Sequence, residues 1–114
     1  MGYCQSINEN EFVASSFGGG LLLFNNNQFI NRFSFYNSSL QTRIGQSGNS
    51  VCVAGTCYDN MGNLWIANSF TTSPLSVKTN EGEWQSFYCG PLAADKLCTD
   101  IIVDDQYGYV WMIV

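Results

Sequence analysis

Two aspartates, Asp59 and Asp105, open the same eight-residue pattern at positions 46 residues apart. Cation binding is the first chemistry to weigh, because the earlier copy, Asp-x-x-Gly-Asn, has some of the oxygen donors of a calcium loop. Calcium needs about six to eight oxygen ligands, and the alternating Asp-x-Asp-x-Asp spacing that would supply them is missing. The other interpretation is that each Asp caps a tight turn by accepting hydrogen bonds from backbone amides two residues on. We predict turn capping and no metal site.

Acid–base catalysis by paired carboxylates is the second chemistry, since Asp104 adjoins Asp105 and Asp100 is close by. Successive side chains of a strand point to opposite faces, so Asp104 and Asp105 should not converge. The chain has no histidine, the commonest general base. It has no Gly-x-Ser-x-Gly motif, and no Lys-Ser/Thr follows the glycines at 18–20, as a phosphate loop would require. The sequence therefore predicts no catalytic residue, no cofactor and no enzyme.

Five cysteines, at positions 4, 52, 57, 89 and 98, are an odd number, which leaves at least one thiol free. We interpret them as small apolar core residues, with a disulfide or a metal as open alternatives. Cys52 and Cys98 are themselves 46 residues apart. Equivalent positions of neighbouring repeats should lie beyond the Cα separation of about 7 Å that a disulfide allows.

Three tryptophans could stack on a sugar ring or a peptide. Trp65 and Trp111 hold the same position of the repeated pattern, which indicates a packing role in the core of each repeat. Trp84 lies outside that register, so it is the candidate for an exposed recognition residue.

These residues are positioned by a turn and the strand after it. Both copies read Asp-x-x-Gly-x-(Leu/Val)-Trp-(Ile/Met). Gly62 and Gly108 supply the positive φ of the turn, and the apolar run that follows is typical of a strand. A hairpin repeated at about 40 to 50 residues indicates a β-propeller blade. We predict an all-β fold of four-stranded antiparallel blades, with turn and core positions at Asp59, Gly62, Trp65, Asp105, Gly108 and Trp111.

The repeats are expected at about 2–36, 50–88 and 97–114, the last one incomplete. Strands are predicted at 2–7, 12–15, 21–24 and 29–35, then at 51–58, 63–68, 75–77 and 84–88, and finally at 96–104 and near 111–114. Phe29, Phe33 and Phe35 are expected on one face of their strand because of their spacing. A closed propeller needs at least about four blades of roughly 40 residues. About two and a half blades therefore predict a piece of a longer chain or a homo-oligomer that closes a ring.

The formal charge is −5, with four scattered cations at Arg32, Arg43, Lys78 and Lys96. Without a basic patch, we predict no nucleic-acid partner. There is no apolar run long enough for a transmembrane helix, and the first residues lack the features of a signal peptide.

The turn segment 59–68 resembles the repeat of the two-component regulator propeller family. Repeats of that family build the large sensory propellers of bacterial hybrid histidine kinases, which face the periplasm, and the resemblance implies such a propeller here. Residues 74–87, together with 108–112, are similar to the propeller proteins of type IX secretion, which are non-enzymatic components of protein export and surface attachment. Streptogramin-lyase propellers have a comparable turn, but that family relies on a histidine.

We therefore expect a binding or scaffold propeller of the bacterial cell envelope, periplasmic or at the cell surface. The alternatives are a fragment of a ligand-sensing propeller of a two-component system and, more remotely, a propeller lyase or hydrolase. A protein or carbohydrate partner is expected to contact the loop after the second strand of the middle repeat, at Phe70, Thr71 and Thr72, and also Trp84.

Overall fold

The computed structural model describes residues 2–5, 10–45 and 50–114. Across these ranges the secondary structure consists of β-strands and turns, with no helix. The strands are β1 (Gly2–Gln5), β2 (Glu11–Gly18), β3 (Gly20–Asn25), β4 (Gln28–Phe33), β5 (Val51–Tyr58), β6 (Leu64–Asn68), β7 (Leu75–Lys78), β8 (Trp84–Phe87), β9 (Asp100–Asp104) and β10 (Tyr109–Ile113).

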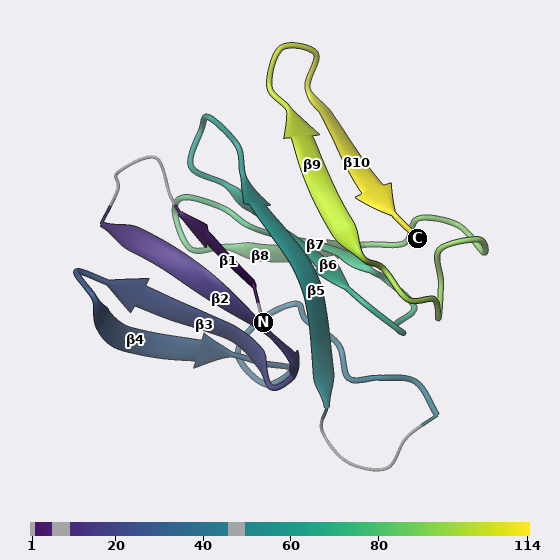
Figure 1. Ribbon diagram of the computed structural model, residues 1–114. Coiled ribbons are helices and arrows are strands. Elements are labelled where there is room, and N and C mark those ends of the chain that lie inside the picture. The colour runs from purple at the N-terminus through teal and green to yellow at the C-terminus, as the bar shows by residue number, and fades with distance from the viewer. Residues whose placement is uncertain (1, 6–9, 46–49) are drawn as a thin grey trace.

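The first four strands form an antiparallel meander, in which each strand pairs with the next (Figure 1). Between β3 and β4, Asn26 and Asn27 have φ values of 52° and 64°. A two-residue type I′ hairpin requires positive φ at both central residues, and Asn tolerates it well. The triple glycine turns β2 into β3, and a Cβ added at Gly20 would collide with the carbonyl oxygen of Phe33. Both turns lie between strands that the sequence predicts, at 12–15, 21–24 and 29–35.

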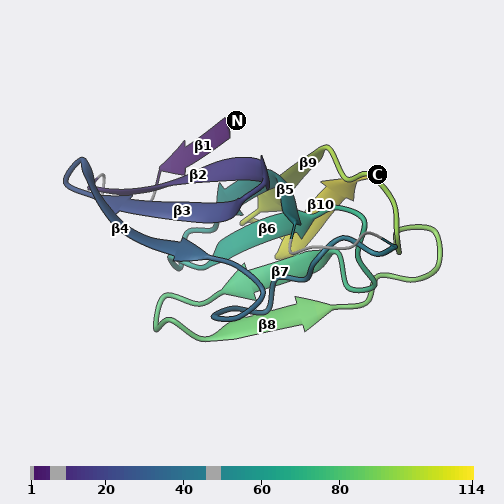
Figure 2. The same cartoon turned by 90° about the horizontal axis from the view of Figure 1, so that it is seen from below.

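The second meander, β5–β8, repeats this antiparallel order, and β9 pairs with β10 as a separate hairpin. The end of β2 pairs with the start of β5 through Phe17 with Cys52 and Gly18 with Val51. This short pairing joins the two meanders into one sheet that curls back on itself. Seen from below, β2–β4 face β6–β8 across the interior (Figure 2).

The curled sheet is a half-barrel consistent with a partial β-propeller, so the predicted fold class is confirmed. Strand β5 runs through the middle of the molecule and contacts β1 on one side and β9 on the other (Figure 1).

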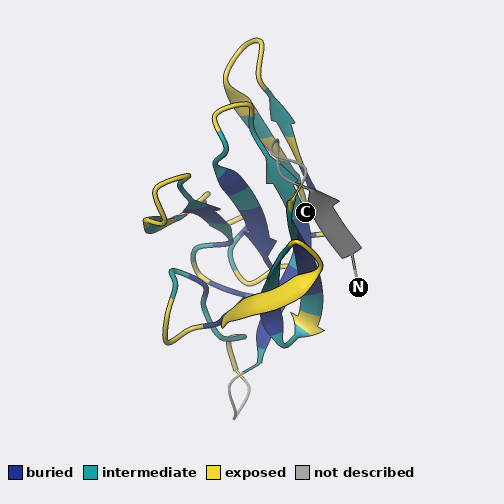
Figure 3. Cartoon of the chain, turned by 90° about the vertical axis from the view of Figure 1, so that its left-hand side faces the viewer, coloured by how far each residue is buried: buried dark blue, intermediate teal, exposed yellow. Residues whose placement is uncertain are grey.

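Two apolar clusters fill the spaces between the first meander, the second meander and the hairpin β9–β10. The larger one lies between the two meanders and contains Val13, Leu21, Phe33, Leu40, Val51, Val53, Leu64 and Ile66. The smaller one contains Ala67, Cys98 and Ile101 and joins the second meander to the hairpin β9–β10. Residues i and i+2 of one strand enter the same cluster, as strand geometry requires. Figure 3 shows the buried segments along the middle of the sheet and exposed residues along β4 and the hairpin tips.

The prediction that Phe29, Phe33 and Phe35 share one face is wrong. The pairing of β3 with β4 shifts by one residue next to Phe24. Such a bulge changes the face to which the following side chains point. Phe33 is consequently buried opposite Leu21, whereas Phe29 is 58% exposed opposite Phe24, and Phe35 lies beyond the end of β4.

Residues 6–9 lie outside the described ranges, so the end of the strand predicted at 2–7 lies there too. None of the described residues form a helix that is long and apolar enough to cross a membrane.

Candidate functional site

The carboxylate of Asp59 lies at the centre of the turn from β5 to β6. Its Oδ1 accepts hydrogen bonds from the backbone N of Met61 at 3.0 Å and of Asn63 at 2.9 Å. Its Oδ2 accepts from Asn63 Nδ2 and from Trp65 Nε1, both at 3.1 Å. Gly62, with φ of 84°, donates its N–H to the Asp59 carbonyl. The carboxylate thus caps the turn and also fixes the Trp65 ring at the start of β6.

These hydrogen bonds also determine the ionisation of Asp59. Partial burial raises the pKa of the carboxyl, but the donors on Trp65, Asn63 and Met61 together outweigh burial and lower the pKa below its ordinary value. A carboxylate held in this way remains ionised and acts as a hydrogen-bond acceptor, not as a proton donor.

The second copy of the turn is built differently. Asp104 Oδ1 accepts from the backbone N of Gln106 at 3.1 Å, and the Asp104 carbonyl accepts from Gly108 N at 2.9 Å. Gly108 has the predicted positive φ, 74°. Asp105, the residue expected to cap this turn, instead accepts from the backbone N of Asn60 at 3.0 Å. The capping residue is therefore Asp104, one position before the predicted one, and Asp105 connects the two turns.

Asp104 and Asp105 consequently bind different backbone groups and do not form a carboxylate pair. Within residues 2–5, 10–45 and 50–114, His, Cys, Asp and Glu side chains do not gather in a group of three that could hold a metal ion.

The tryptophans occupy three different environments. Trp65 is half-buried, stacks on Phe87 with ring centroids 6.1 Å apart, and packs against the smaller apolar cluster. Trp84 packs against the larger cluster, with its ring 5.1 Å from that of Phe33, so the structure places it as a packing residue. Trp111, expected in the core like Trp65, is instead 60% exposed, because it lies on the opposite face of β10 from Val110 and Met112, which pack against the smaller cluster.

Four cysteine thiols are described, and all are free. Cys52 and Cys98 are buried core residues, as predicted, and burial raises the pKa of each thiol. Cys57 packs against the smaller cluster, whereas Cys89 is exposed and departs from the prediction of a core residue. The side chain of Cys4 lies outside the described part of the chain.

The loop predicted to contact a partner is largely held by hydrogen bonds to other parts of the chain. Thr71 is fully buried and its hydroxyl donates to the carbonyl of Asn68 at 3.0 Å, which corrects the expectation of a surface contact there. Phe70 is half-buried, not exposed as expected, and its N–H donates to the carbonyl of Lys96 at 2.8 Å. Thr72 is exposed. A partner contact at Phe70 and Thr72 stays a prediction.

Sequence reasoning missed Asn68, which is fully buried at the end of β6. Its Oδ1 accepts from the backbone N of Gln41 at 2.7 Å, and its Nδ2 donates to the carbonyl of Cys52 at 3.2 Å. Its neighbour Ser69 binds both the N and the carbonyl of Cys98 through one hydroxyl. These two side chains connect three segments that are distant in sequence. The available signal was a run of polar residues directly after an apolar strand.

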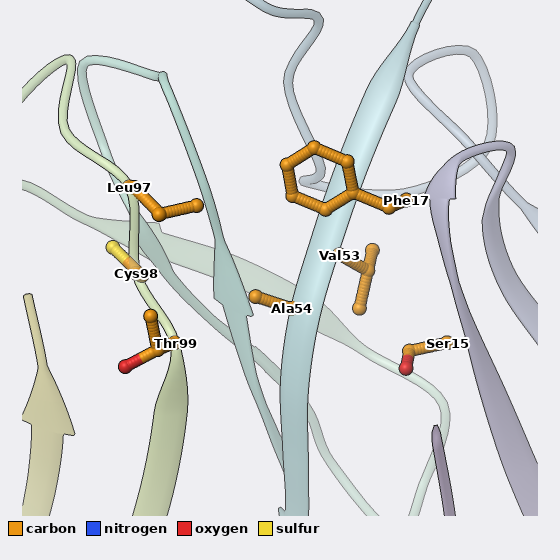
Figure 4. Close-up of a pocket in the computed structure, with 7 residues that line it drawn as sticks. All are labelled: Ser15, Phe17, Val53, Ala54, Leu97, Cys98 and Thr99. Carbon is orange, nitrogen blue, oxygen red and sulfur yellow. The ribbon is translucent and has the colours of Figure 1, made fainter. Parts of the chain in front are cut away.

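A pocket of about 410 Å³ opens beside β5. Ser15 and Phe17 of β2 form one wall, and residues 97–99 before β9 form the other, with Val53 and Ala54 between them (Figure 4). The lining residues are Ser15, Phe17, Val53, Ala54, Leu97, Cys98 and Thr99. This volume is in the range that binds small ligands or a side chain of a partner.

An aromatic and cationic cluster adjoins this pocket through Phe17, which lines it. Phe17 is 57% exposed, and its ring meets that of Phe70 edge-on at 6.2 Å. The Arg43 guanidinium lies 4.1 Å from the centre of the Phe70 ring, a cation–π contact. The charge of Arg43 also reaches Cys52, where it partly opposes the rise in pKa that burial causes. We call Phe17, Phe70 and Arg43 the rim cluster. It offers stacking and a positive charge but no general base.

Comparison with known proteins finds similarity to a solved structure. No protein-family model matches the chain, and no curated protein matches it either. The chain is similar to the solved structure of PorZ, described as an essential bacterial surface component of the type-IX secretion system of the human oral-microbiomic Porphyromonas gingivalis. The TM-score is 0.85 with 21% identity over 97% of this chain. The chain spans only 15% of the length of PorZ, and at this identity the likeness shows the fold alone.

Proposed function

We propose that this chain is part of a non-enzymatic binding or scaffold propeller of the bacterial cell envelope, acting at the cell surface or in the periplasm as part of type IX secretion. The observation that carries the proposal is the likeness to PorZ over nearly the whole chain. The resemblance of residues 74–87 to the propellers of type IX secretion agrees with this proposal. A chain without histidine also favours binding over the lyase chemistry of other propellers.

In this proposal the rim cluster is the contact surface for a protein partner. Exposed aromatic residues and arginine are the residue types that carry most of the energy of protein interfaces. Phe17 meets this description, with Arg43 held in place over Phe70 beside it. The pocket under the rim is large enough for one apolar side chain of the partner.

The test is a chimera, in which this chain replaces the matching segment of PorZ in a P. gingivalis strain that lacks PorZ. We expect the chimera to be displayed at the surface and to restore type IX secretion. A chimera that is displayed in normal amount, but leaves secretion at the level of the strain lacking PorZ, would contradict the proposal.

Point variants of the chimera then test the rim cluster. Phe17→Ala and Arg43→Ala should lower secretion several-fold without changing surface display, because each removes a contact group and leaves the core intact. Tyr88→Ala is the matched control, since Tyr88 is a similarly exposed aromatic at 60% and lies outside the rim. Equal secretion by all three variants would remove the rim cluster from the proposal.

A further inference from the structure

The hairpin β9–β10 has one covered face and one open apolar face. Val110 and Met112 pack against the smaller apolar cluster. The alternate residues of β10, Tyr109, Trp111 and Ile113, are 59%, 60% and 51% exposed. Ile102 pairs directly with Trp111 across the hairpin and is 52% exposed. We call Ile102, Tyr109, Trp111 and Ile113 the Trp111 face.

The equivalent face of the second meander carries Trp65, and the hairpin β9–β10 covers it. Trp65, 46 residues before Trp111, packs together with Leu75 against the cluster that also holds Ile101, Val110 and Met112. On the other side of β6, Leu64 and Ile66 enter the larger cluster against the first meander. The tryptophan face of one sheet is thus covered by the aliphatic face of the next sheet, and the positions equivalent to Leu64 and Ile66 are Val110 and Met112.

The first meander carries a face of the kind that covers a tryptophan in the later sheets, and its edge at β4 is exposed, with Phe29 58% exposed and Arg32 exposed beside it. Phe12 aligns with Leu64 at an offset of 52 residues, so it holds the position that does the covering in the later sheets. Phe12 stacks on Phe24 at 4.9 Å, and Phe29 meets Phe24 edge-on at 5.8 Å. Val13 and Leu21 point the opposite way into the larger cluster. We call Phe12, Phe24, Phe29 and Arg32 the Phe29 face.

Charge on the two faces is complementary. Arg32 pairs with Leu22 on β3, two residues before Phe24, and therefore lies on the Phe29 face. Asp100 pairs with Ile113, and Asp104 pairs with Tyr109, so both carboxylates flank the Trp111 face. In a chain with only four cations and a net charge of −5, an exposed arginine on the one face and two aspartates on the other favour contact between them.

We propose that the Trp111 face of one molecule binds the Phe29 face of a second copy of this chain. The two faces lie at opposite ends of the molecule, at β9–β10 and at β2–β4, so the contact is head-to-tail (Figures 1 and 2). It continues between molecules the packing that already joins the second meander to the hairpin. Head-to-tail contacts of this kind close into rings where the rotation permits.

The experiment is sedimentation velocity over a concentration series, with charge introduced separately on each face. Wild type should show a mass above that of the monomer that rises with concentration. Trp111→Lys and Phe29→Lys should each remain monomeric, because either change removes a large aromatic ring from the contact and replaces it with a flexible, strongly hydrated side chain. Leu92→Lys, at a residue 87% exposed and outside both faces, should assemble like wild type. Circular dichroism of each variant verifies the fold.

Mixing the two monomeric variants distinguishes the head-to-tail contact from other arrangements. Phe29→Lys retains an intact Trp111 face and Trp111→Lys retains an intact Phe29 face, so an equimolar mixture should form a one-to-one dimer and nothing larger. A wild type that is monomeric at every concentration would overturn the proposal and assign the Trp111 face to another occupant. Assembly of Phe29→Lys on its own would overturn it in favour of contact between two Trp111 faces. Neither sedimentation measurement depends on secretion by the PorZ chimera. A failure of this proposal can therefore be told apart from a failure of the proposed function.

Discussion

The hairpins β5–β6 and β9–β10 carry the same motif, yet they differ in what lies over the tryptophan. In the first, Asp59 caps the turn, binds Trp65 Nε1, and the ring packs between sheets. In the second, Asp104 caps the turn, and Trp111 is 60% exposed. The motif therefore specifies a hairpin by local hydrogen bonds, whereas burial of its tryptophan depends on a neighbouring sheet. The same residue has a different energetic role in each copy.

Truncating the two tryptophans should give the largest contrast. Trp65→Ala removes a packed ring and should lower the free energy of unfolding by about 3 kcal/mol. Trp111→Ala removes a ring that is mostly in water and should lower it by less than about 0.5 kcal/mol in the monomer. Urea denaturation at low protein concentration measures both values. Equal losses would show that the two hairpins are not differently covered.

Removing the two repeated aspartates should give the next largest contrast. Asp59→Ala leaves four donors without their acceptor and should cost about 2 kcal/mol. Asp105→Ala breaks one exposed hydrogen bond to Asn60 and should cost about 0.5 kcal/mol. The comparison is made from thermal unfolding of the two variants side by side. A larger loss for Asp105 would mean that the contact between the turns matters more than the cap.

Substituting the two turn glycines should give a smaller difference in stability. Gly62 and Gly108 have φ of 84° and 74°, where an L side chain costs about 1 kcal/mol. A Cβ at Gly62 would also lie 3.3 Å from Asn80 Cβ, whereas at Gly108 it would meet open space. We expect Gly62→Ala to lower the free energy of unfolding by a few tenths of a kcal/mol more than Gly108→Ala, which is measured as a lower unfolding midpoint. Identical midpoints for the two variants would show that the Asn80 side chain moves away from the added methyl group at no cost in stability.

The smallest effect is a pH dependence confined to the first hairpin. The pKa of Asp59 is lowered in the folded protein, so its ionised form binds protons less readily than in the unfolded chain. Its contribution is full above the ordinary Asp pKa of about 4 and is lost as the pH falls through the lowered value. Asp59→Asn should therefore lose most stability relative to wild type near neutral pH, and the gap should narrow in acid. A gap that widens with falling pH would contradict the assigned direction.

The strand order and the turns were predictable because their signals are local. The paired asparagines at 26–27, the triple glycine and the Asp-x-x-Gly pattern each fix a turn through their own φ values and hydrogen bonds. The bulge beside Phe24, and with it the separation of Phe29 from Phe33, depends on how two strands pair and has no local signal. The shift of the cap from Asp105 to Asp104 is of the same kind.

The candidate site was predictable only in part. Phe70 was singled out from its place in a polar loop, and it does lie in the rim cluster. Its neighbours Phe17 and Arg43 come from distant segments, and Phe17 is brought there by the pairing of β2 with β5. Burial of Thr71 follows from the junction around Asn68, a three-segment contact that a sequence pattern does not reveal.

The most direct test of the difference between the two hairpins is hydroxyl-radical footprinting of the wild-type chain, with oxidation of each tryptophan read by mass spectrometry. Trp65 and Trp111 have the same intrinsic reactivity, so their rates compare exposure alone. In dilute protein we predict that Trp111 is oxidised several-fold faster than Trp65, and that Trp111 becomes protected as the concentration rises while Trp65 does not change. Equal rates for the two residues in dilute protein would contradict the account, because the two copies of the motif would then be covered alike.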